Sequence, residues 1–243
     1  MVPSFDALLS AKGRRLLASG GGPLRGILKT GQRFVAVGGL FSPTGCRKVV
    51  RELERHLAPH LTAMDEPIPP QTIFGMRRNY EELLPKSVRC RTALLAAPRS
   101  RASQAARAIG LPGLVGSPTF RALAELLSGR RLRRHFGTQV LAYGPGDYAG
   151  PHNDHHPEDA EARDGYTDVH LTFCTDGVEA QSLVYEVKGH LSAQENVATL
   201  GGLTAYRLPF WHYTTPLQAR RGREARARRW VLLGTFLDAE ARA

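Results

Sequence analysis

Three residues in the second half of the chain have side chains that could bind one metal ion. His152 and Asp154 stand two positions apart in the segment 150–154 (GPHND), and His212 lies in the segment 209–213 (PFWHY). Residues two apart on a strand point to the same side, so His152 and Asp154 can face one ion, and a neighbouring strand would bring His212 to it. Two imidazoles and one carboxylate on one face of an iron ion leave the opposite positions open for a cosubstrate and O2. The pattern predicts an iron centre for redox chemistry.

A His-x-Asp pair alone is weak evidence, because such pairs occur by chance in many chains and usually lie on the surface. The flanking sequence is more specific. The segment 143–147 (YGPGD) places a strand end and a tight turn before His152. The segment 202–212 (GLTAYRLPFWH) runs from a glycine through an apolar strand to the second histidine, and an arginine opens the apolar run 229–236 (RWVLLGTF).

The other histidines fit a metal site less well. His155 and His156 follow the first pair, but on an extended strand His155 faces away from His152, and both are expected to border the cleft. His170 lies in an alternating strand, where a histidine that packs in the core or lines a cleft is the more usual case. The remaining ones stand at no useful spacing from a second ligand: His56, His60, His135 and His190.

The residues around these candidates predict a β-core. From Thr138 onward, apolar residues alternate with polar ones or form short runs, and turns containing Gly, Pro or Asp separate them. The expected strands are 139–143, 169–174, 182–187, 203–208 and 230–237. Short strands at these intervals, with no helices between them, predict an antiparallel sandwich or barrel.

The preceding part of the chain is expected to support this β-core. A strand at 34–37 precedes a helix that begins at Ser42, an N-cap followed by an N1 proline, and runs to about residue 60. Residues 71–136 are mostly helical in character, and their clearest helix spans 117–129. Residues 1–33 are expected to form a peripheral segment.

The fold class is therefore α+β, and the length of 243 residues fits one domain of ordinary size. We expect a single domain at 34–243, in which 34–137 is mainly helical support and 138–237 is the catalytic core. A hydrophobic content of 42% with 23% charged residues is typical of globular proteins, and it excludes global disorder. No apolar run approaches the roughly 20 residues of a membrane-spanning helix, so no membrane partner is expected.

Charge and cysteine content bear on partners and compartment. A net charge of +11 suits an acidic partner such as nucleic acid. However, the arginines cluster only at 130–134 and 220–229, without the interleaved aromatic residues of a single-strand binding surface, so nucleic acid is the weaker interpretation. Cys46, Cys90 and Cys174 are far apart and odd in number, which argues against a disulfide framework and favours a reducing cytoplasm. The N-terminus lacks the pattern of a secretory signal.

These motifs together resemble the prolyl-hydroxylase-like branch of the 2-oxoglutarate/Fe(II)-dependent dioxygenase superfamily. That branch carries a Y-x-P-G turn before H-x-D, a glycine-led strand into the distal histidine, and an arginine that opens the final apolar strand. In this chain the corresponding features are Tyr143 to Gly146, His152 with Asp154, Gly202 to His212 with Pro216, and Arg229 to Phe236. The resemblance covers 138–237 well, 34–60 in part, and 61–137 not at all.

The resemblance implies a double-stranded β-helix, or jelly roll, in the C-terminal half, flanked by N-terminal helices. It implies Fe(II) held by His152, Asp154 and His212, with 2-oxoglutarate as cosubstrate. It also implies that Arg229 binds the distal carboxylate of 2-oxoglutarate, and a planar guanidinium suits this role because it pairs with a carboxylate through two parallel hydrogen bonds. Tyr143 matches a tyrosine whose hydroxyl binds the cosubstrate in this branch, although an ordinary strand tyrosine fits the pattern equally well.

One departure from the branch leaves the anchor open. The loop between His212 and Arg229 is longer than is usual in prolyl hydroxylases, so Arg220, Arg226 and Arg228 are alternatives to Arg229. Arg229 is preferred because it directly precedes the apolar strand, where an inward side chain has a fixed direction.

The function implied by the resemblance is hydroxylation of an unactivated C–H bond in a peptide, a protein side chain or an amino-acid-like metabolite, while 2-oxoglutarate and O2 become succinate and CO2. The first alternative is an AlkB-type nucleic-acid demethylase. That group typically has a second arginine six residues after the first, where this chain has Thr235. The second alternative is a non-catalytic jelly-roll protein that holds a metal ion. Arg229 argues against it, since a structural site needs no carboxylate clamp and structural zinc normally has a fourth protein ligand.

Overall fold

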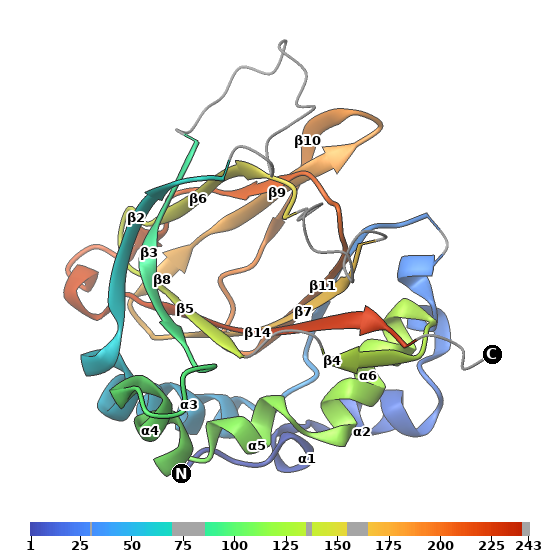
Figure 1. Ribbon diagram of the computed structural model, residues 1–243, viewed down its shortest axis with the longest axis horizontal. Coiled ribbons are helices and arrows are strands. Elements are labelled where there is room, and N and C mark those ends of the chain that lie inside the picture. Colours follow the sequence, from blue (N-terminus) through green and yellow to red (C-terminus); the bar gives the residue numbers. More distant parts are fainter. Residues whose placement is uncertain (30, 70–85, 135–137, 155–164, 240–243) are drawn as a thin grey trace.

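A computed structural model describes residues 1–29, 31–69, 86–134, 138–154 and 165–239. Its central feature is an antiparallel sheet that curves until it nearly closes into a barrel, with helices packed along one side (Figure 1). This is the α+β class with a jelly-roll core that the sequence predicts. The strands of the curved sheet are β1 (Phe34–Gly38), β2 (Thr62–Pro67), β3 (Ser87–Leu94), β4 (Leu132–Arg134), β5 (Gln139–Tyr143), β6 (Tyr148–His152), β7 (Thr167–Cys174), β9 (Ser182–Val187), β10 (His190–Asn196), β11 (Gly202–Arg207), β12 (His212–Thr214) and β14 (Arg229–Asp238).

The order of the strands divides this sheet into two walls. Along one wall run β1, β11, β7, β14 and β5, and the facing wall consists of β6, β12, β9 and β10. Strand β3 pairs with both β5 and β6, so it carries the sheet around the bend between the walls. A separate two-stranded sheet joins β8 (Val178–Ala180) to β13 (Gln218–Ala219) at one end of the barrel.

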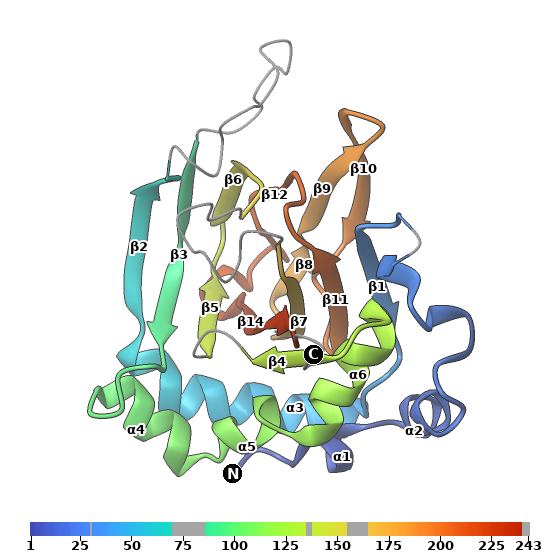
Figure 2. The ribbon, with the colours of Figure 1, turned by 45° about the vertical axis from the view of Figure 1, so that its right-hand side comes forward.

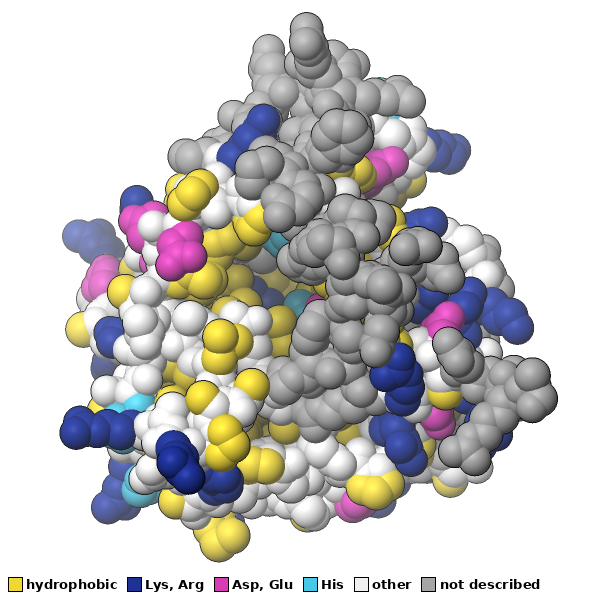
Figure 3. Space-filling view, viewed as in Figure 1, with side chains coloured by type: hydrophobic (Ala, Val, Ile, Leu, Met, Phe, Trp, Pro, Cys, Tyr) yellow, Lys and Arg dark blue, Asp and Glu magenta, His cyan; other side chains and the backbone are white. Residues whose placement is uncertain are grey.

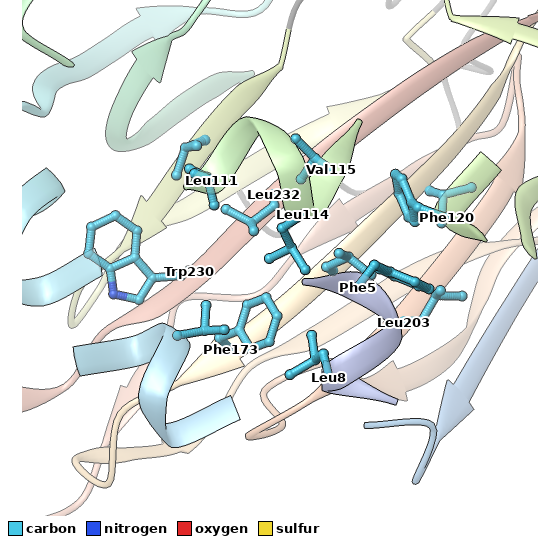
Figure 4. Close-up of a cluster of buried hydrophobic side chains, with 14 of the residues drawn as sticks. Phe5, Leu8, Leu111, Leu114, Val115, Phe120, Phe173, Leu203, Trp230 and Leu232 are labelled. Atoms are coloured by element: carbon cyan, nitrogen blue, oxygen red, sulfur yellow. The ribbon is translucent and has the colours of Figure 1, made fainter. Parts of the chain in front are cut away.

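Helices cover the outer face of the first wall (Figure 2). They are α1 (Phe5–Leu8), α2 (Ala11–Ala18), α3 (Pro43–Glu52), α4 (Arg101–Ala108), α5 (Leu111–Val115) and α6 (Pro118–Ser128). Alternate residues of β7 and β14 point toward these helices, and Phe173, Trp230 and Leu232 are fully buried there (Figure 4). The residues between them, including His170 and Arg229, point to the inside of the barrel. The period of two therefore separates an apolar outer face from an inner face that carries both polar and apolar side chains.

The N-terminal segment packs more deeply than expected. Residues 1–33 were predicted to be peripheral, yet Phe5 and Leu8 have no exposed surface and belong to the main core. The ring of Phe5 lies 5.7 Å from that of Phe41 and 5.4 Å from that of Phe120. These side chains fill the space between α3, α6 and the sheet, which the sequence alone did not indicate.

The two best-defined helices begin where the sequence predicts. Ser42 and Ser117 cap α3 and α6, and each hydroxyl oxygen accepts a hydrogen bond from a backbone N–H of the first turn. Helix α3 continues through a π-helical turn, Leu53–Leu57, and a 3-10 turn, Ala58–His60. Gly129 ends α6 with φ of +66°, and an added Cβ there would lie 2.9 Å from the Cα of Gly26. The end of the helix thus requires glycine both for its backbone angle and for space.

Part of the supporting region is β-structure rather than helix. Residues 71–136 were expected to be mostly helical, but β3 lies within this range and pairs with β2, β5 and β6. The expectation was wrong here because β2 is exposed along most of its length and β3 is half-buried, so neither shows a clear apolar period. Their pairing partners, not their own pattern, make them strands. His135, one of the rival histidines, lies outside the described residues.

Two properties of the chain concern its environment. The cysteines Cys46, Cys90 and Cys174 are all free and buried. Within the described residues, no helix has the length and apolar character needed to cross a membrane.

Candidate metal centre and its cavity

His152 is the last residue of β6, and Asp154 lies just beyond the strand. The sequence places both on one strand face, but the structure brings them together differently, because Asp154 has a left-handed backbone with φ of +53°. Tyr166 donates a hydrogen bond of 2.6 Å from its hydroxyl to the carbonyl oxygen of Asp154 and so supports this conformation. The turn directs the carboxylate back to His152, and Oδ1 lies 3.3 Å from Nε2 of the imidazole.

His212 reaches the same point from the neighbouring strand. It opens β12, which pairs with β6 so that His212 stands directly opposite His152. Its Nε2 lies 3.6 Å from Oδ2 of Asp154, and the two imidazole centroids are 4.4 Å apart. One ligand atom from each of the three residues lies within 4.8 Å of the others. A single ion can therefore contact all three.

Both imidazoles have their second nitrogen fixed by the backbone. Nδ1 of His152 lies 2.6 Å from the carbonyl oxygen of Gly150, and Nδ1 of His212 lies 2.7 Å from that of Phe210. A carbonyl oxygen accepts only, so each Nδ1 donates its proton there, and in the neutral imidazole Nε2 keeps the lone pair that a metal ion would take. Metal-ligating histidines are held in this way in metalloproteins generally.

Burial and the charges within the trio shift the pKa of each member. Burial alone raises the pKa of Asp154, but the adjacent imidazoles of His152 and His212 reverse this and hold it well below its usual range. Burial and then the neighbouring His152 lower the pKa of His212 to about 4. For His152, burial acts downward, yet the charge and hydrogen bond of Asp154 leave its pKa raised. An ionised carboxylate beside a neutral His212 matches what a metal ion requires.

The trio lines a cavity of about 420 Å³ between the two walls of the barrel. In Figure 3 the molecule is hollowed on this face, and histidine side chains are visible inside the hollow. Most of the wall is apolar, and its polar members besides the trio include Tyr143, Asp168, His170, Tyr206 and Arg229.

Arg229 is the buried cation of this cavity. It opens β14 and is only 3% exposed, and its pKa is lowered by burial. Nη1 donates to Oε1 of Gln181 over 2.9 Å and Nη2 to Oγ1 of Thr172 over 3.4 Å, while Nε has no hydrogen-bond partner. Among the described residues no carboxylate pairs with it. A buried guanidinium without a counter-ion is costly, which makes the site suitable for an anionic ligand.

Tyr143 forms one side of this anion site. It ends β5 directly opposite Arg229 in the pairing with β14, and its ring centroid lies 5.4 Å from Cζ of Arg229. Burial raises the pKa of Tyr143 far above the usual range, so its hydroxyl remains a hydrogen-bond donor.

The alternative arginines lie outside the cavity. Arg226 pairs with Asp176 at 3.1 Å, Arg228 pairs with Glu54 at 2.8 Å, and Arg220 donates to the carbonyl oxygen of Val178. Each thus binds an acceptor elsewhere, and Arg229 is the arginine that lines the cavity within the part of the chain described.

The rival histidines divide into two groups. His170 lines the cavity, but it contacts Asp168 and Tyr206 and is not part of the metal-binding trio. His155 and His156 lie outside the described residues.

Sequence reasoning missed one polar residue of the cavity wall and the two hydrogen-bond partners of Arg229. Asp168, Thr172 and Gln181 were not singled out, although Asp168, His170 and Thr172 share one face of β7 by alternation. That alternation was the available signal. Gln181 offered none, because it precedes β9 and reaches Arg229 only through the folding of the sheet.

Comparisons with known proteins support the fold. No family model and no curated protein matches the sequence. Among solved structures, a prolyl-4-hydroxylase from Pseudomonas putida is 13% identical, with a TM-score of 0.50 over 89% of this chain and 100% of that one. An oxidoreductase of the 2OG-Fe(II) oxygenase family from Burkholderia pseudomallei is 12% identical, with a TM-score of 0.51 over 95% and 92%. SnoK, a non-haem α-ketoglutarate-dependent carbocyclase from nogalamycin biosynthesis, is 13% identical, with a TM-score of 0.51 over 99% and 88%.

The chain therefore has the fold of the 2-oxoglutarate/Fe(II) oxygenases. The predicted resemblance to their prolyl-hydroxylase-like branch extends to three dimensions, because a prolyl-4-hydroxylase is among the similar structures. The solved structures differ in what they act on, so they leave the primary substrate of this chain open.

Proposed function

We propose that this protein is an Fe(II)- and 2-oxoglutarate-dependent oxygenase that hydroxylates an unactivated C–H bond of a peptide, a protein side chain or an amino-acid-like metabolite. The observation that supports this most is the pairing of two sites in one cavity. A three-ligand centre, His152, Asp154 and His212, shares the cavity with Arg229, a buried cation that has no carboxylate partner among the described residues.

The donor set fits an open iron site better than a closed structural one. A structural zinc ion normally has four protein ligands, whereas the ligand group found within the described residues has three. Two imidazoles and one carboxylate are the donors that Fe(II) oxygenases use on one face of the ion. Bound Fe(II) with 2-oxoglutarate supplies oxidative decarboxylation by O2, which yields succinate and CO2 and an oxidant for the substrate.

The residues of this chain position the reactants. His152 and His212 present Nε2 to the ion because the carbonyl groups of Gly150 and Phe210 hold their Nδ1 protons. Arg229 offers unpaired N–H groups to the distal carboxylate of 2-oxoglutarate, and the neutral hydroxyl of Tyr143 can donate to the same carboxylate.

Much of the cavity wall is apolar. Leu141, Leu183, Val231 and Leu233 line it, and they surround the charged groups with a medium of low polarity. In such a medium the attraction between Arg229 and a carboxylate is stronger than in water.

An anaerobic titration with Fe(II) and 2-oxoglutarate tests the proposal. The wild-type protein is expected to develop the weak visible charge-transfer band of chelated iron, and His152→Ala is expected to lose it. Asp176→Ala serves as the control, because Asp176 pairs with Arg223 and Arg226 outside the cavity. A wild-type protein that gives no band, or a band that persists in His152→Ala, contradicts the proposal.

A second readout separates the proposal from nucleic-acid demethylation. Succinate formation is measured with peptides, free amino acids and methylated oligonucleotides. Thr235 lies on the cavity wall where an AlkB-type protein has its second arginine, so turnover is expected with the first two classes. Turnover with the oligonucleotides alone would favour the demethylase instead.

A further inference from the structure

Asp168 is a buried carboxylate on the cavity wall that the proposed mechanism does not use. It lies on β7, and its side chain is 7% exposed. Its Oδ1 has no hydrogen-bond partner, and no lysine or arginine pairs with it within the described part of the chain. An ionised carboxylate in such a place loses hydration without a full replacement. It is therefore a candidate for binding a group that a ligand brings.

The contacts of Asp168 leave one buried oxygen without a hydrogen-bond donor. Oδ2 lies 3.4 Å from Nε2 of His170, and Nδ1 of His170 forms a hydrogen bond with the hydroxyl of Tyr206. When Tyr206 donates this bond, Nε2 of the neutral imidazole carries the proton and faces Oδ2. His170 can satisfy only Oδ2 in this arrangement, and Oδ1 remains without a donor.

This cluster is contiguous with the metal centre. Tyr206 stands opposite Asp168 in the pairing of β11 with β7, and its ring lies 5.2 Å from the imidazole of His212. A single tyrosine ring thus separates the cluster from a metal ligand. A ligand held at Asp168 would therefore lie in the same cavity as the metal centre.

The same strand places Asp168 away from the anion site. Thr172, which accepts a hydrogen bond from Arg229, follows Asp168 by four residues on the inner face of β7. At about 3.3 Å per residue, the two positions are about 13 Å apart. The cavity therefore has a cation, Arg229, toward one end and an anion, Asp168, toward the other. One end suits the carboxylate of 2-oxoglutarate and the other suits a positive group.

We propose that Asp168 binds a protonated amine or a guanidinium of the primary substrate, carried on a mainly apolar chain. That this ligand is the substrate rests on the oxygenase function proposed above, whereas the existence of a cation site does not depend on it. Apolar side chains such as Leu141, Leu183 and Leu233 line the cavity and can contact the chain of the ligand. Asp168 is then a residue that determines substrate specificity.

Binding of a simple cation tests the inference without knowledge of the natural substrate. Calorimetric titration of the protein with n-hexylammonium, n-hexylguanidinium and 1-hexanol, in the presence of 2-oxoglutarate, compares charged and neutral heads on one chain. The two cations are expected to bind more tightly than the alcohol. Asp168→Asn, which keeps the shape of the side chain, is expected to weaken cation binding by roughly ten- to a hundredfold, as for the loss of one charge-assisted hydrogen bond.

Two control variants separate the local site from the overall charge. Asp176→Asn changes the net charge equally but lies outside the cavity, and it should leave cation binding unchanged. Thr235→Val changes the cavity-wall residue that pairs with Asp168 on the neighbouring strand β14. It alters no charge and should have little effect on the preference for cations. Equal binding of cation and alcohol by the wild type overturns the inference, as does full cation affinity in Asp168→Asn.

The iron titration makes the two proposals distinguishable. A band in the wild type and in Asp168→Asn, without any preference for cations, overturns the cation site alone. Cation binding that depends on Asp168 in a protein that gives no band overturns the oxygenase and leaves the cation site in place.

Discussion

Replacement of Arg229 by methionine should separate ligand affinity from stability. Methionine is unbranched and apolar and fills a similar path from the backbone. We expect Arg229→Met to bind 2-oxoglutarate at least a hundredfold more weakly while the protein stays folded. A residue that serves mainly to hold the fold together would give the opposite result.

The magnitude follows from the contacts of the guanidinium. Arg229 keeps N–H groups free after its bonds to Gln181 and Thr172, and a carboxylate can take two of them. A hydrogen bond to a charged group contributes at least about 1.5 kcal/mol, so two contribute at least about 3 kcal/mol. That energy corresponds to a factor of roughly a hundred or more in Kd.

The effect on stability should be small because the charge has no counter-ion in the ligand-free protein. Burial lowers the pKa of Arg229, which means that the fold disfavours its charge. Methionine removes this cost but leaves Oε1 of Gln181 without its donor, which costs about 1 kcal/mol. The two effects oppose each other, so the free energy of unfolding should change by about 1 kcal/mol or less.

Calorimetry of 2-oxoglutarate binding and urea unfolding measure the two quantities on the same sample. Arg226→Met is the matched control, because Arg226 lies three residues away and is 69% exposed. Unchanged 2-oxoglutarate affinity in Arg229→Met would refute the assignment of the anchor. Loss of several kcal/mol of stability would show that the arginine is structural.

Three further predictions each concern the truncation of one side chain. Tyr143→Phe should weaken 2-oxoglutarate binding by about two- to tenfold, the loss of one neutral hydrogen bond, and unchanged affinity in calorimetry would mark Tyr143 as an ordinary strand residue. Tyr166→Phe removes the bond that supports the turn at Asp154 and should weaken Fe(II) binding by about tenfold or more, whereas equal affinity in a metal titration would mean that the turn holds without it. Phe173→Ala should lower the free energy of unfolding by roughly 3–5 kcal/mol in urea, and a loss below about 1 kcal/mol would contradict its placement in the core.

The β-core was the most predictable part of the fold. Strands such as β5, β9 and β14 begin and end close to the predicted positions. One face of each packs against apolar groups, so apolar residues recur along the strand in a pattern that the sequence shows. The helices α3 and α6 were equally clear, since serine and proline at a helix start act through local bonds. Strands β2 and β3 were missed because their burial depends on partners elsewhere in the chain.

The sequence by itself determined which side chains are candidates for chemistry. The sequence shows the types and spacing of His152, Asp154 and His212. It also shows that Arg229 directly precedes an apolar strand. Because Arg229 directly precedes an apolar strand, the sequence also predicted a fixed direction for its side chain, and the structure shows that this direction is into the cavity.

Only the tertiary structure decided how these groups meet. The left-handed turn at Asp154 depends on a hydrogen bond from Tyr166, twelve residues away, and no local pattern predicts it. Which arginine lines the cavity depended on the fold, because Arg226 and Arg228 pair with Asp176 and Glu54 elsewhere. The free oxygen of Asp168 is likewise a property of its surroundings. Whether a buried charge is compensated depends on contacts between distant segments, and these exist only once the sheet has curved into its nearly closed barrel.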